Sequence, residues 1–181
     1  MDAADRQGGV ACIGLGSNLG DSLQTLTDSW QRLGLQDGIS LKALSPPYRT
    51  EPVGMESRHW FINAVGLLRT TLSPEALLDR LLIIEQEFGR RRNLKASGYQ
   101  DRTLDLDLLL YDDVIINTPR LQIPHPELHK RLFVLVPLAV LVPNQLHPRL
   151  QSSMDTLRRQ LLQKDNSSIP EQVHWPPRVK S

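Results

Sequence analysis

The sequence predicts an α+β sandwich in which helices cover one face of a mostly antiparallel sheet. Short apolar runs bounded by glycine and proline alternate with amphipathic segments of helical period. Their order along the chain is strand, helix, strand, strand, helix, strand, which is the split βαβ pattern. The chain has 181 residues, of which 40% are hydrophobic and 23% are charged, so a single domain with a substantial core is expected over 1–181.

The first half of the chain contains three predicted elements and a loop. Residues 1–9 are expected to fray, and the apolar run at 10–16, which glycines end, predicts a buried strand. A helix is expected from Asp21 to about Leu33, because Asp21 offers an N-cap and Gln24 completes the capping-box spacing. The alternation of ISLKALS predicts a second strand. SPPYRTEPVG then combines three prolines with a glycine, which predicts a shaped loop that is neither helix nor central strand.

The second half repeats this arrangement and then adds helices. WFINAVGLLRT has strand composition, and Ser73 with Pro74 begins a helix that Gly89 ends. The polar loop RRRNLKASGYQD leads into the predicted strand RTLDLDLLLY, and VIIN predicts a short partner strand. RLQIPHPELHKR is a turn-rich basic connector, and RLFVLVPLAVL predicts a buried helix interrupted by proline. The last amphipathic helix is expected at 154–162, and residues 164–181 are expected to form a loosely held tail.

Charge and cysteine content exclude several classes of protein. The 21 basic and 20 acidic side chains nearly cancel, so no overall field attracts the chain to nucleic acid or to a membrane. Cys12 is the only cysteine, which excludes an internal disulfide and a cysteine-built zinc site and favours a buried structural thiol. No apolar run is long enough to span a bilayer, and the acidic N-terminal residues do not resemble an export signal. We therefore expect a cytoplasmic protein.

The segment RTLDLDLLLY carries the most informative pattern. Because strand side chains alternate between faces, Asp105 and Asp107 are expected on one face and Leu104, Leu106, Leu108 and Leu110 on the other. The Cα atoms of the two aspartates would lie about 6.6 Å apart. Two carboxylates at this spacing can bracket the metal ions of a two-metal phosphoryl-transfer site, and hard oxygen ligands suit Mg²⁺. For the pair alone, an ordinary solvated strand face is slightly favoured, although aspartate is depleted in strands.

A group of cations precedes this strand, namely Arg90, Arg91, Arg92, Lys95 and Arg102. The planar guanidinium of arginine matches phosphate oxygens with two parallel hydrogen bonds, so arginines beside a carboxylate pair suit a polyphosphate bound with Mg²⁺. For the charge run by itself, a solvated face is favoured by about two to one. Carboxylates for metal next to arginines for phosphate are more specific than either feature alone.

Three weaker features each have two interpretations. Gly14, Gly16 and Gly20 in GLGSNLGD match neither the dinucleotide fingerprint nor a P-loop, and a tight strand-to-helix turn accounts for them. His125 contacts a nucleotide or pins its own turn, and the sequence favours the turn. Asn63 lies between apolar neighbours and requires hydrogen-bond partners, which are either a ligand edge or nearby loop backbone, with little to separate the two.

Six segments, in this order, resemble the 6-hydroxymethyl-7,8-dihydropterin pyrophosphokinase family of folate biosynthesis from about Ala11 to Pro143. They are SPPYRTEPVG, FINAV, the helix end EFGR, RTLDLDLLLY, IPHPELHKR and LFVLVPLAVLVP. The resemblance implies a ferredoxin-like α+β fold, two Mg²⁺ ions and ATP as co-substrate. It further implies that a pyrophosphoryl group is transferred to the pterin hydroxymethyl oxygen with release of AMP. We expect a monomer that binds these small molecules and neither nucleic acid nor membrane.

The resemblance also implies a role for individual residues. Asp105 and Asp107 would hold the metals and, with the phosphate-contacting Arg90 and Arg102, form the catalytic set. The residues implied at the pterin are Thr50, Val53, Gly54, Phe61, Asn63, Tyr99 and Phe133, with the ring stacked between the two phenylalanines. Those implied on the ATP side are Glu85, Arg102, His125 and Arg131.

The chain departs from the family pattern at three places. Tyr99-Gln100-Asp101 stands where the family often has tryptophan followed by Gly-Pro, so Tyr99 becomes the candidate aromatic and Asp101 adds an unexpected negative charge. Leu82 replaces a glutamine, and Pro126 replaces an aromatic residue. Such departures would permit a regulatory module that binds pterin or ATP without turnover. An RNA-binding sheet is the other alternative, but three Trp, three Tyr, three Phe and a balanced charge argue against it.

Overall fold

The computed structural model describes residues 8–52, 59–90, 101–164 and 168–177. Its main sheet consists of β1 (Gly9–Ser17), β2 (Ile39–Leu44), β3 (Tyr48–Thr50), β4 (Phe61–Thr70), β5 (Asp105–Tyr111) and β8 (Glu171–Gln172). The strands lie in the order β5-β1-β4-β3-β8, β2 also pairs with β4, and the ladders between them are antiparallel. Two short strands, β6 (Ile116–Asn117) and β7 (Gln122–Ile123), form a separate antiparallel pair.

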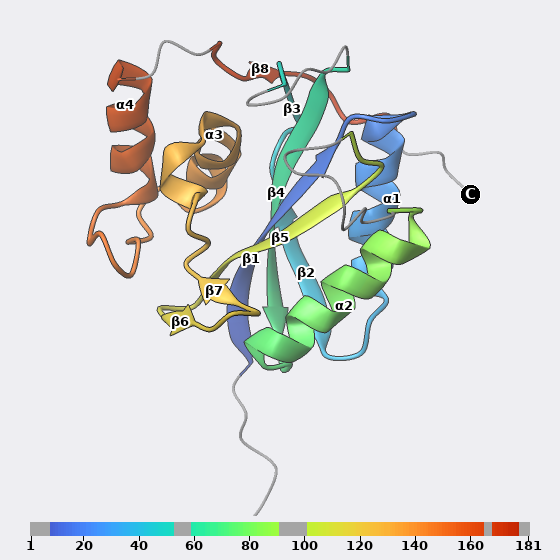
Figure 1. Ribbon diagram of the computed structural model, residues 1–181, viewed down its shortest axis with the longest axis horizontal. Helices are drawn as coiled ribbons and strands as arrows, with labels where there is room; N and C mark the ends of the chain where they lie inside the picture. The colour runs from blue at the N-terminus through green and yellow to red at the C-terminus, as the bar shows by residue number, and fades with distance from the viewer. Residues whose placement is uncertain (1–7, 53–58, 91–100, 165–167, 178–181) are drawn as a thin grey trace, which may run out of the picture.

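Helices lie on both faces of the sheet. Within the described residues they are α1 (Ser22–Gly34), α2 (Pro74–Glu87), α3 (Leu132–Leu141), α4 (Met154–Lys164) and the short 3₁₀ helix η1 (Leu128–Lys130). Figure 1 shows α1 and α2 on one side of the sheet and α3 and α4 on the other. The prediction that helices cover one face only is therefore wrong, because the apolar α3 packs with α4 on the second face. None of the helices in the described ranges is long and apolar enough to cross a bilayer.

Both N-caps that were predicted from the sequence are formed. The side chain of Asp21 accepts a hydrogen bond from the Gln24 backbone N–H at 3.1 Å, and Ser73 caps α2 in the same way. Gly20 and Gly89 have φ angles of +69° and +81°, so they provide the turn into α1 and the end of α2 in a backbone conformation that favours glycine. Local sequence chemistry thus determines where these two helices begin and end.

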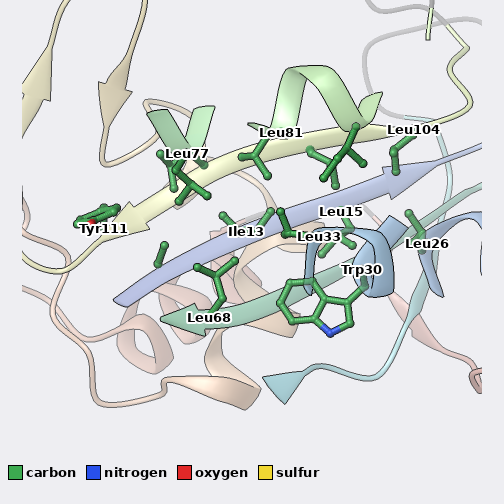
Figure 2. Close-up of a cluster of buried hydrophobic side chains, with 14 of the residues drawn as sticks. Ile13, Leu15, Leu26, Trp30, Leu33, Leu68, Leu77, Leu81, Leu104 and Tyr111 are labelled. Carbon is green, nitrogen blue, oxygen red and sulfur yellow. The ribbon is translucent and has the colours of Figure 1, made fainter. Parts of the chain in front are cut away.

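The face toward α1 and α2 carries the larger core cluster (Figure 2). Leu26, Trp30 and Leu33 of α1 meet Leu77 and Leu81 of α2 over the inward side chains of the sheet. A fully buried leucine of this kind contributes about 1.5–3 kcal/mol relative to an exposed one. These contacts fix the positions of β1, β4 and β5, and therefore also of the side chains on the opposite face of these strands.

A β-bulge in β5 changes which side chains share a face. Cys12 of β1 pairs with Leu110 of β5, but Ile13 pairs with Leu108, so Leu109 is the extra residue. As a result both Leu109 and Leu110 pack in the second core cluster, under α3 and α4. The predicted alternation therefore holds up to Leu108 and is wrong for Leu110.

Two further predictions are wrong where the chain is better ordered than expected. Residues 48–50, inside the proline-rich loop, form β3 between β4 and β8, because they lie between prolines and keep their own backbone N–H groups. Residues 168–177 are not a loosely held tail. They supply β8, and the indole Nε1 of Trp175 donates a hydrogen bond to the Ser45 carbonyl at 3.0 Å.

Burial predicts the reactivity of Cys12. Its side chain is 1% exposed, and desolvation raises the pKa of the thiol to about 12, so the reactive thiolate is almost absent near neutral pH. We expect the native protein to react negligibly with a disulfide reagent at about pH 8, and one thiol per chain to react after unfolding in guanidinium chloride. Rapid reaction of the native protein would contradict the buried position.

Candidate functional site

A cavity of about 300 Å³ opens on the sheet face that is not covered by α1 and α2. Its floor is formed by β1, β4 and β5. Its walls come from the end of β3 and from residues 127–134, which include η1 and the first turn of α3. The predicted site residues that line it are Thr50, Phe61, Asn63, Arg102, Asp105, Asp107, Arg131 and Phe133. Residues separated by more than eighty positions are thus brought to one site. Val53, Gly54 and Tyr99 fall outside the described residues.

Glycines of β1 leave room beside the two carboxylates. Gly16 pairs with Asp105 and Gly14 pairs with Asp107 in the β1–β5 ladder, and both glycines line the cavity. A Cβ atom on Gly16 would lie 3.1 Å from Oδ1 of Asn63, closer than side chains normally pack. The prediction that a turn explains these two glycines is wrong. The missed signal was their spacing of two, which places both on one face of a strand.

Asp105 lies at the centre of an ion-pair network. Its Oδ2 is 2.8 Å from Nη1 of Arg102, and its Oδ1 accepts a hydrogen bond from Arg90. Arg90 also donates to Glu85, which is 2% exposed and whose Oε1 accepts the backbone N–H of Leu106 at 2.8 Å. Glu85 is not among the residues that line the cavity, so it anchors Arg90 and β5 from behind. Of the two arginines, Arg102 lines the cavity, whereas Arg90, like Glu85, is not among the lining residues.

Asp107 carries a charge that its surroundings disfavour. Burial, followed by the charges of Asp105 and Glu85, raises its pKa to about 7, against the opposing effect of Arg102 and Arg90. A cation beside the pair would relieve this repulsion. Among the described residues no group of three or more His, Cys, Asp or Glu gathers around a metal position. Two carboxylates fit Mg²⁺, which keeps several waters and takes further ligands from substrate phosphates.

Asn18 holds the backbone of Arg102 and was not predicted from the sequence. The N–H of Arg102 donates to Oδ1 of Asn18 at 2.8 Å, and the N–H of Asn18 donates to the Arg102 carbonyl at 3.2 Å. Nδ2 of Asn18 also donates to Oδ1 of Asp101 at 2.7 Å, which gives the unexpected negative charge a structural partner. The one signal in the sequence for this role of Asn18 was its position, as a polar residue directly after a buried strand. Asn18 is 4% exposed and fixes the approach of Arg102 to Asp105.

The aromatic residues form the other end of the cavity. Phe61 and Phe133 both line it, and each has an arginine over its ring, with Arg102 at 5.5 Å and Arg131 at 5.7 Å from the ring centres. Such a pair suits a flat, conjugated ligand.

Asn63 lies between this aromatic end and the carboxylates. It is 7% exposed, and its Nδ2 donates to Oγ1 of Thr50 at 2.8 Å, so its partner is a neighbouring side chain and not loop backbone. Both residues line the cavity, which places a buried, oriented amide beside Phe61.

Two predicted nucleotide residues lie in different surroundings. Arg131 lines the cavity and stands at the N-cap position of α3, without a side-chain capping hydrogen bond. His125 is not among the lining residues, and its Nδ1 accepts the backbone N–H of Glu127 at 3.2 Å, which agrees with the favoured interpretation that it pins its turn. Burial lowers the pKa of His125 below its ordinary value, so the imidazole is neutral at pH 7. Glu127 and Lys130, which line the rim as an ion pair with 2.9 Å between Nζ and Oε1, were not predicted.

Comparison with known proteins identifies the family of this chain. The family model of 7,8-dihydro-6-hydroxymethylpterin-pyrophosphokinase (HPPK) matches residues 12–143. A 2-amino-4-hydroxy-6-hydroxymethyldihydropteridine pyrophosphokinase from Synechocystis is 39% identical, covering 92% of this chain and 89% of its own length. A protein of the same name from Bacillus subtilis is 35% identical, covering 91% of this chain and 96% of its own.

Solved structures show the same fold. An HPPK-DHPS crystallised in complex with substrates superimposes with a TM-score of 0.70 at 14% identity, over 87% of this chain. A Plasmodium falciparum HPPK-DHPS gives the same TM-score at 13% identity. This chain spans 44% and 47% of those longer chains, so the likeness concerns their matching part and confirms the ferredoxin-like α+β fold. Because the family model matches most of this chain, from residue 12 to residue 143, the chain belongs to the 7,8-dihydro-6-hydroxymethylpterin-pyrophosphokinase family.

Proposed function

We propose that this protein transfers the pyrophosphoryl group of ATP to the hydroxymethyl oxygen of 6-hydroxymethyl-7,8-dihydropterin in folate biosynthesis. The pterin oxygen forms a bond to the β-phosphorus, the bond from that phosphorus to the bridging oxygen of the α-phosphate breaks, and AMP leaves. The alcohol proton is released to solvent. The observation that carries this proposal is the carboxylate pair of β5, set in one cavity with Arg102 and two phenylalanines.

The pterin is assigned to the aromatic end of the cavity. Phe61 and Phe133 would stack on its two faces, and the amide of Asn63, oriented by Thr50, would hydrogen-bond its polar edge. The cavity volume of about 300 Å³ is at the small end of the usual range for ligand pockets and suits a bicyclic ring. Val53, Gly54 and Tyr99 stay predictions for this pocket.

The triphosphate is assigned to the charged end. Arg102 and Arg90 already contact Asp105 and would bind phosphate oxygens as the triphosphate arrives, with Arg131 on the nucleotide side. Asp105 and Asp107 would hold two Mg²⁺ ions. When bound, these ions supply neutralising charge at the phosphates. Glu85 would act through Arg90, and a nucleotide contact by His125 stays a prediction.

Positioning and charge stabilisation account for catalysis in this arrangement. The cavity orders the acceptor alcohol at its aromatic end and the β-phosphorus at its charged end, which converts a bimolecular encounter into a reaction between aligned groups. Arginine donors held by buried partners are oriented before the reaction begins, so they need no reorganisation as charge moves toward the leaving AMP. We also infer a cytoplasmic monomer with one catalytic domain over 1–181 and no nucleic acid partner.

The direct test is to incubate the purified protein with ATP, Mg²⁺ and 6-hydroxymethyl-7,8-dihydropterin and to separate the nucleotides. Release of AMP that depends on the pterin supports the proposal. Release of ADP would instead mean transfer of a single phosphoryl group. If both substrates bind and no nucleotide product forms, the regulatory alternative replaces the enzyme.

Asn18→Ala tests whether the buried amide positions Arg102. The substitution removes the two hydrogen bonds that the Asn18 side chain makes to residues 101 and 102, and we expect kcat to fall about tenfold, which corresponds to about 1.4 kcal/mol of transition-state stabilisation. The backbone N–H of Arg102, left without its acceptor, should also lower the free energy of unfolding by about 1–3 kcal/mol. Steady-state kinetics and thermal unfolding measure both effects. Asn117→Ala, at an exposed asparagine that accepts one hydrogen bond, is the control, and equal kcat in the two variants would contradict the positioning role.

A further inference from the structure

We propose that residues 168–177, here called the C-terminal strap, position the pterin side of the cavity by holding β3 in place. The strap lies outside the segment that matches the family model, which ends at residue 143. The inference rests on the proposed function, because it concerns affinity for the pterin. Figure 1 shows β8, the strand within the strap, alongside β3 at the edge of the sheet.

Main-chain contacts make the strap a second partner for β3. Tyr48 pairs with Gln172 and Arg49 pairs with Glu171 in an antiparallel ladder, and the N–H of Val173 donates to the Pro47 carbonyl at 2.9 Å. On its other side β3 has only a three-pair ladder with β4. A strand this short between prolines has little stability as a free edge. The strap therefore supplies two of the five residue pairs that join β3 to its neighbouring strands.

Side chains of the strap also contact β3 and the residues just before it. Arg49 donates from Nε and Nη2 to one oxygen of Glu171, at 3.2 and 2.6 Å, and its guanidinium lies 4.9 Å from the ring centre of Trp60. Trp175 packs against the first core cluster while its Nε1 holds the Ser45 carbonyl. Contacts of the strap thus begin before β3 and extend along it.

The strap also reaches a residue of the cavity wall. Oγ of Ser168 donates to Oε2 of Glu51 at 3.2 Å, and Glu51 lines the cavity next to Thr50. Thr50 is 7% exposed, accepts the hydrogen bond that orients Asn63, and pairs with Phe61 in the β3–β4 ladder. A displacement of β3 would therefore move the partners assigned to the pterin ring and its polar edge.

The sheet order predicts that this effect is confined to one substrate. The carboxylate pair and Arg102 belong to β5 and its approach, and β1 and β4 lie between β5 and β3. Loosening β3 should weaken pterin binding and leave the phosphate end unchanged. A segment that only stabilised the fold would not separate the two substrates in this way.

The test uses the full chain with the double substitution Glu171→Ala/Trp175→Ala. We expect the KM for the pterin to rise about five- to tenfold, while kcat and the KM for ATP stay within about twofold of wild type. Trp175→Phe, which keeps an aromatic ring and loses the hydrogen bond to Ser45, should give a smaller rise of about twofold. The control is Asp79→Ala/Ile83→Ala on α2, which removes an exposed acidic partner of an ion pair and an exposed apolar side chain, and which should leave the KM for the pterin unchanged.

The outcomes separate this inference from the proposed function. A lower melting temperature with an unchanged KM for the pterin would overturn the positioning role and leave the strap as a stabilising segment only. A proportional rise in both KM values would overturn it as well. If the wild type releases no AMP, the proposed function fails, and fluorescence titration with the pterin still compares the affinities of wild type and variants. If the wild type turns over and the double variant binds the pterin with the same affinity as the wild type, the positioning role of the strap is refuted and the proposed function stands.

Discussion

Asp107→Asn is expected to reduce pyrophosphoryl transfer by at least about 1000-fold and, at neutral pH, to make the fold more stable. Loss of one carboxylate removes half of the protein ligands assigned to Mg²⁺, and groups that stabilise developing charge typically contribute factors of 10² to 10³ or more each. Turnover is measured as AMP release under saturating substrates. Near-normal turnover of Asp107→Asn, or of Asp105→Ala, would contradict the metal assignment.

The gain in stability follows from the raised pKa of Asp107. An unfolded aspartate has a pKa of about 3.9, and the folded pKa is about 7, so between these values the folded state binds more protons than the unfolded state. The free energy of unfolding therefore falls as pH rises through this window, and the penalty is complete above about pH 7. Asparagine does not ionise and avoids this penalty. At about pH 8 we expect the variant to melt a few degrees above wild type, with a smaller difference near pH 4.

Comparison with Asp105→Asn tests whether the gain in stability of Asp107→Asn comes from the raised pKa of Asp107. Asp105 is paired with Arg90 and Arg102, so its neutralisation leaves two partly buried guanidinium groups without their full charge partner. This variant should lose activity and also melt below wild type. The exposed Asp113→Asn serves as control for the removal of a negative charge and should change neither property. If Asp107→Asn melts below wild type at about pH 8, the pKa of Asp107 is not raised as described.

Arg102→Ala has the second largest expected effect. Arg102 contacts Asp105 at 2.8 Å and lies over Phe61, so it joins the charged end of the cavity to the aromatic end. We expect kcat to fall about 100- to 1000-fold, as is typical when a preoriented donor to a developing charge is removed. Arg102→Lys keeps the charge but not the planar pair of donors, so it should recover only part of this loss.

Single-turnover kinetics with excess enzyme separate the chemical step from binding in the Arg102 variants. Arg120→Ala breaks an exposed ion pair with Asp79, away from the cavity, and is the matched control. Its rate should equal that of wild type. A rate for Arg102→Ala equal to that of Arg120→Ala would show that the guanidinium does not act on the phosphates.

Local chemistry made much of the fold predictable from the sequence. The N-caps at Asp21 and Ser73, the end of α2 at Gly89 and the strands of alternating or continuous apolar character are each determined by neighbouring residues. The carboxylate pair was predictable for the same reason, since two residues two positions apart in a strand share a face.

Features that depend on distant partners were not predictable. The bulge at Leu109 arises from register against β1, and β3 forms because β4 and β8 lie on either side of it. Asn18 serves the site through the backbone of Arg102, which is 84 positions away in the sequence. Side-chain composition carries no record of such contacts, because each is created only when the sheet brings the two segments together.

The most direct test of the central claim is to follow a phosphorus radiolabel placed at the β position of ATP. If the carboxylate pair supports pyrophosphoryl transfer, the label moves to the pterin product together with the γ-phosphorus, and the nucleotide product is unlabelled AMP. Label that stays with the nucleotide, as ADP, while the pterin carries a single phosphoryl group, would contradict the account.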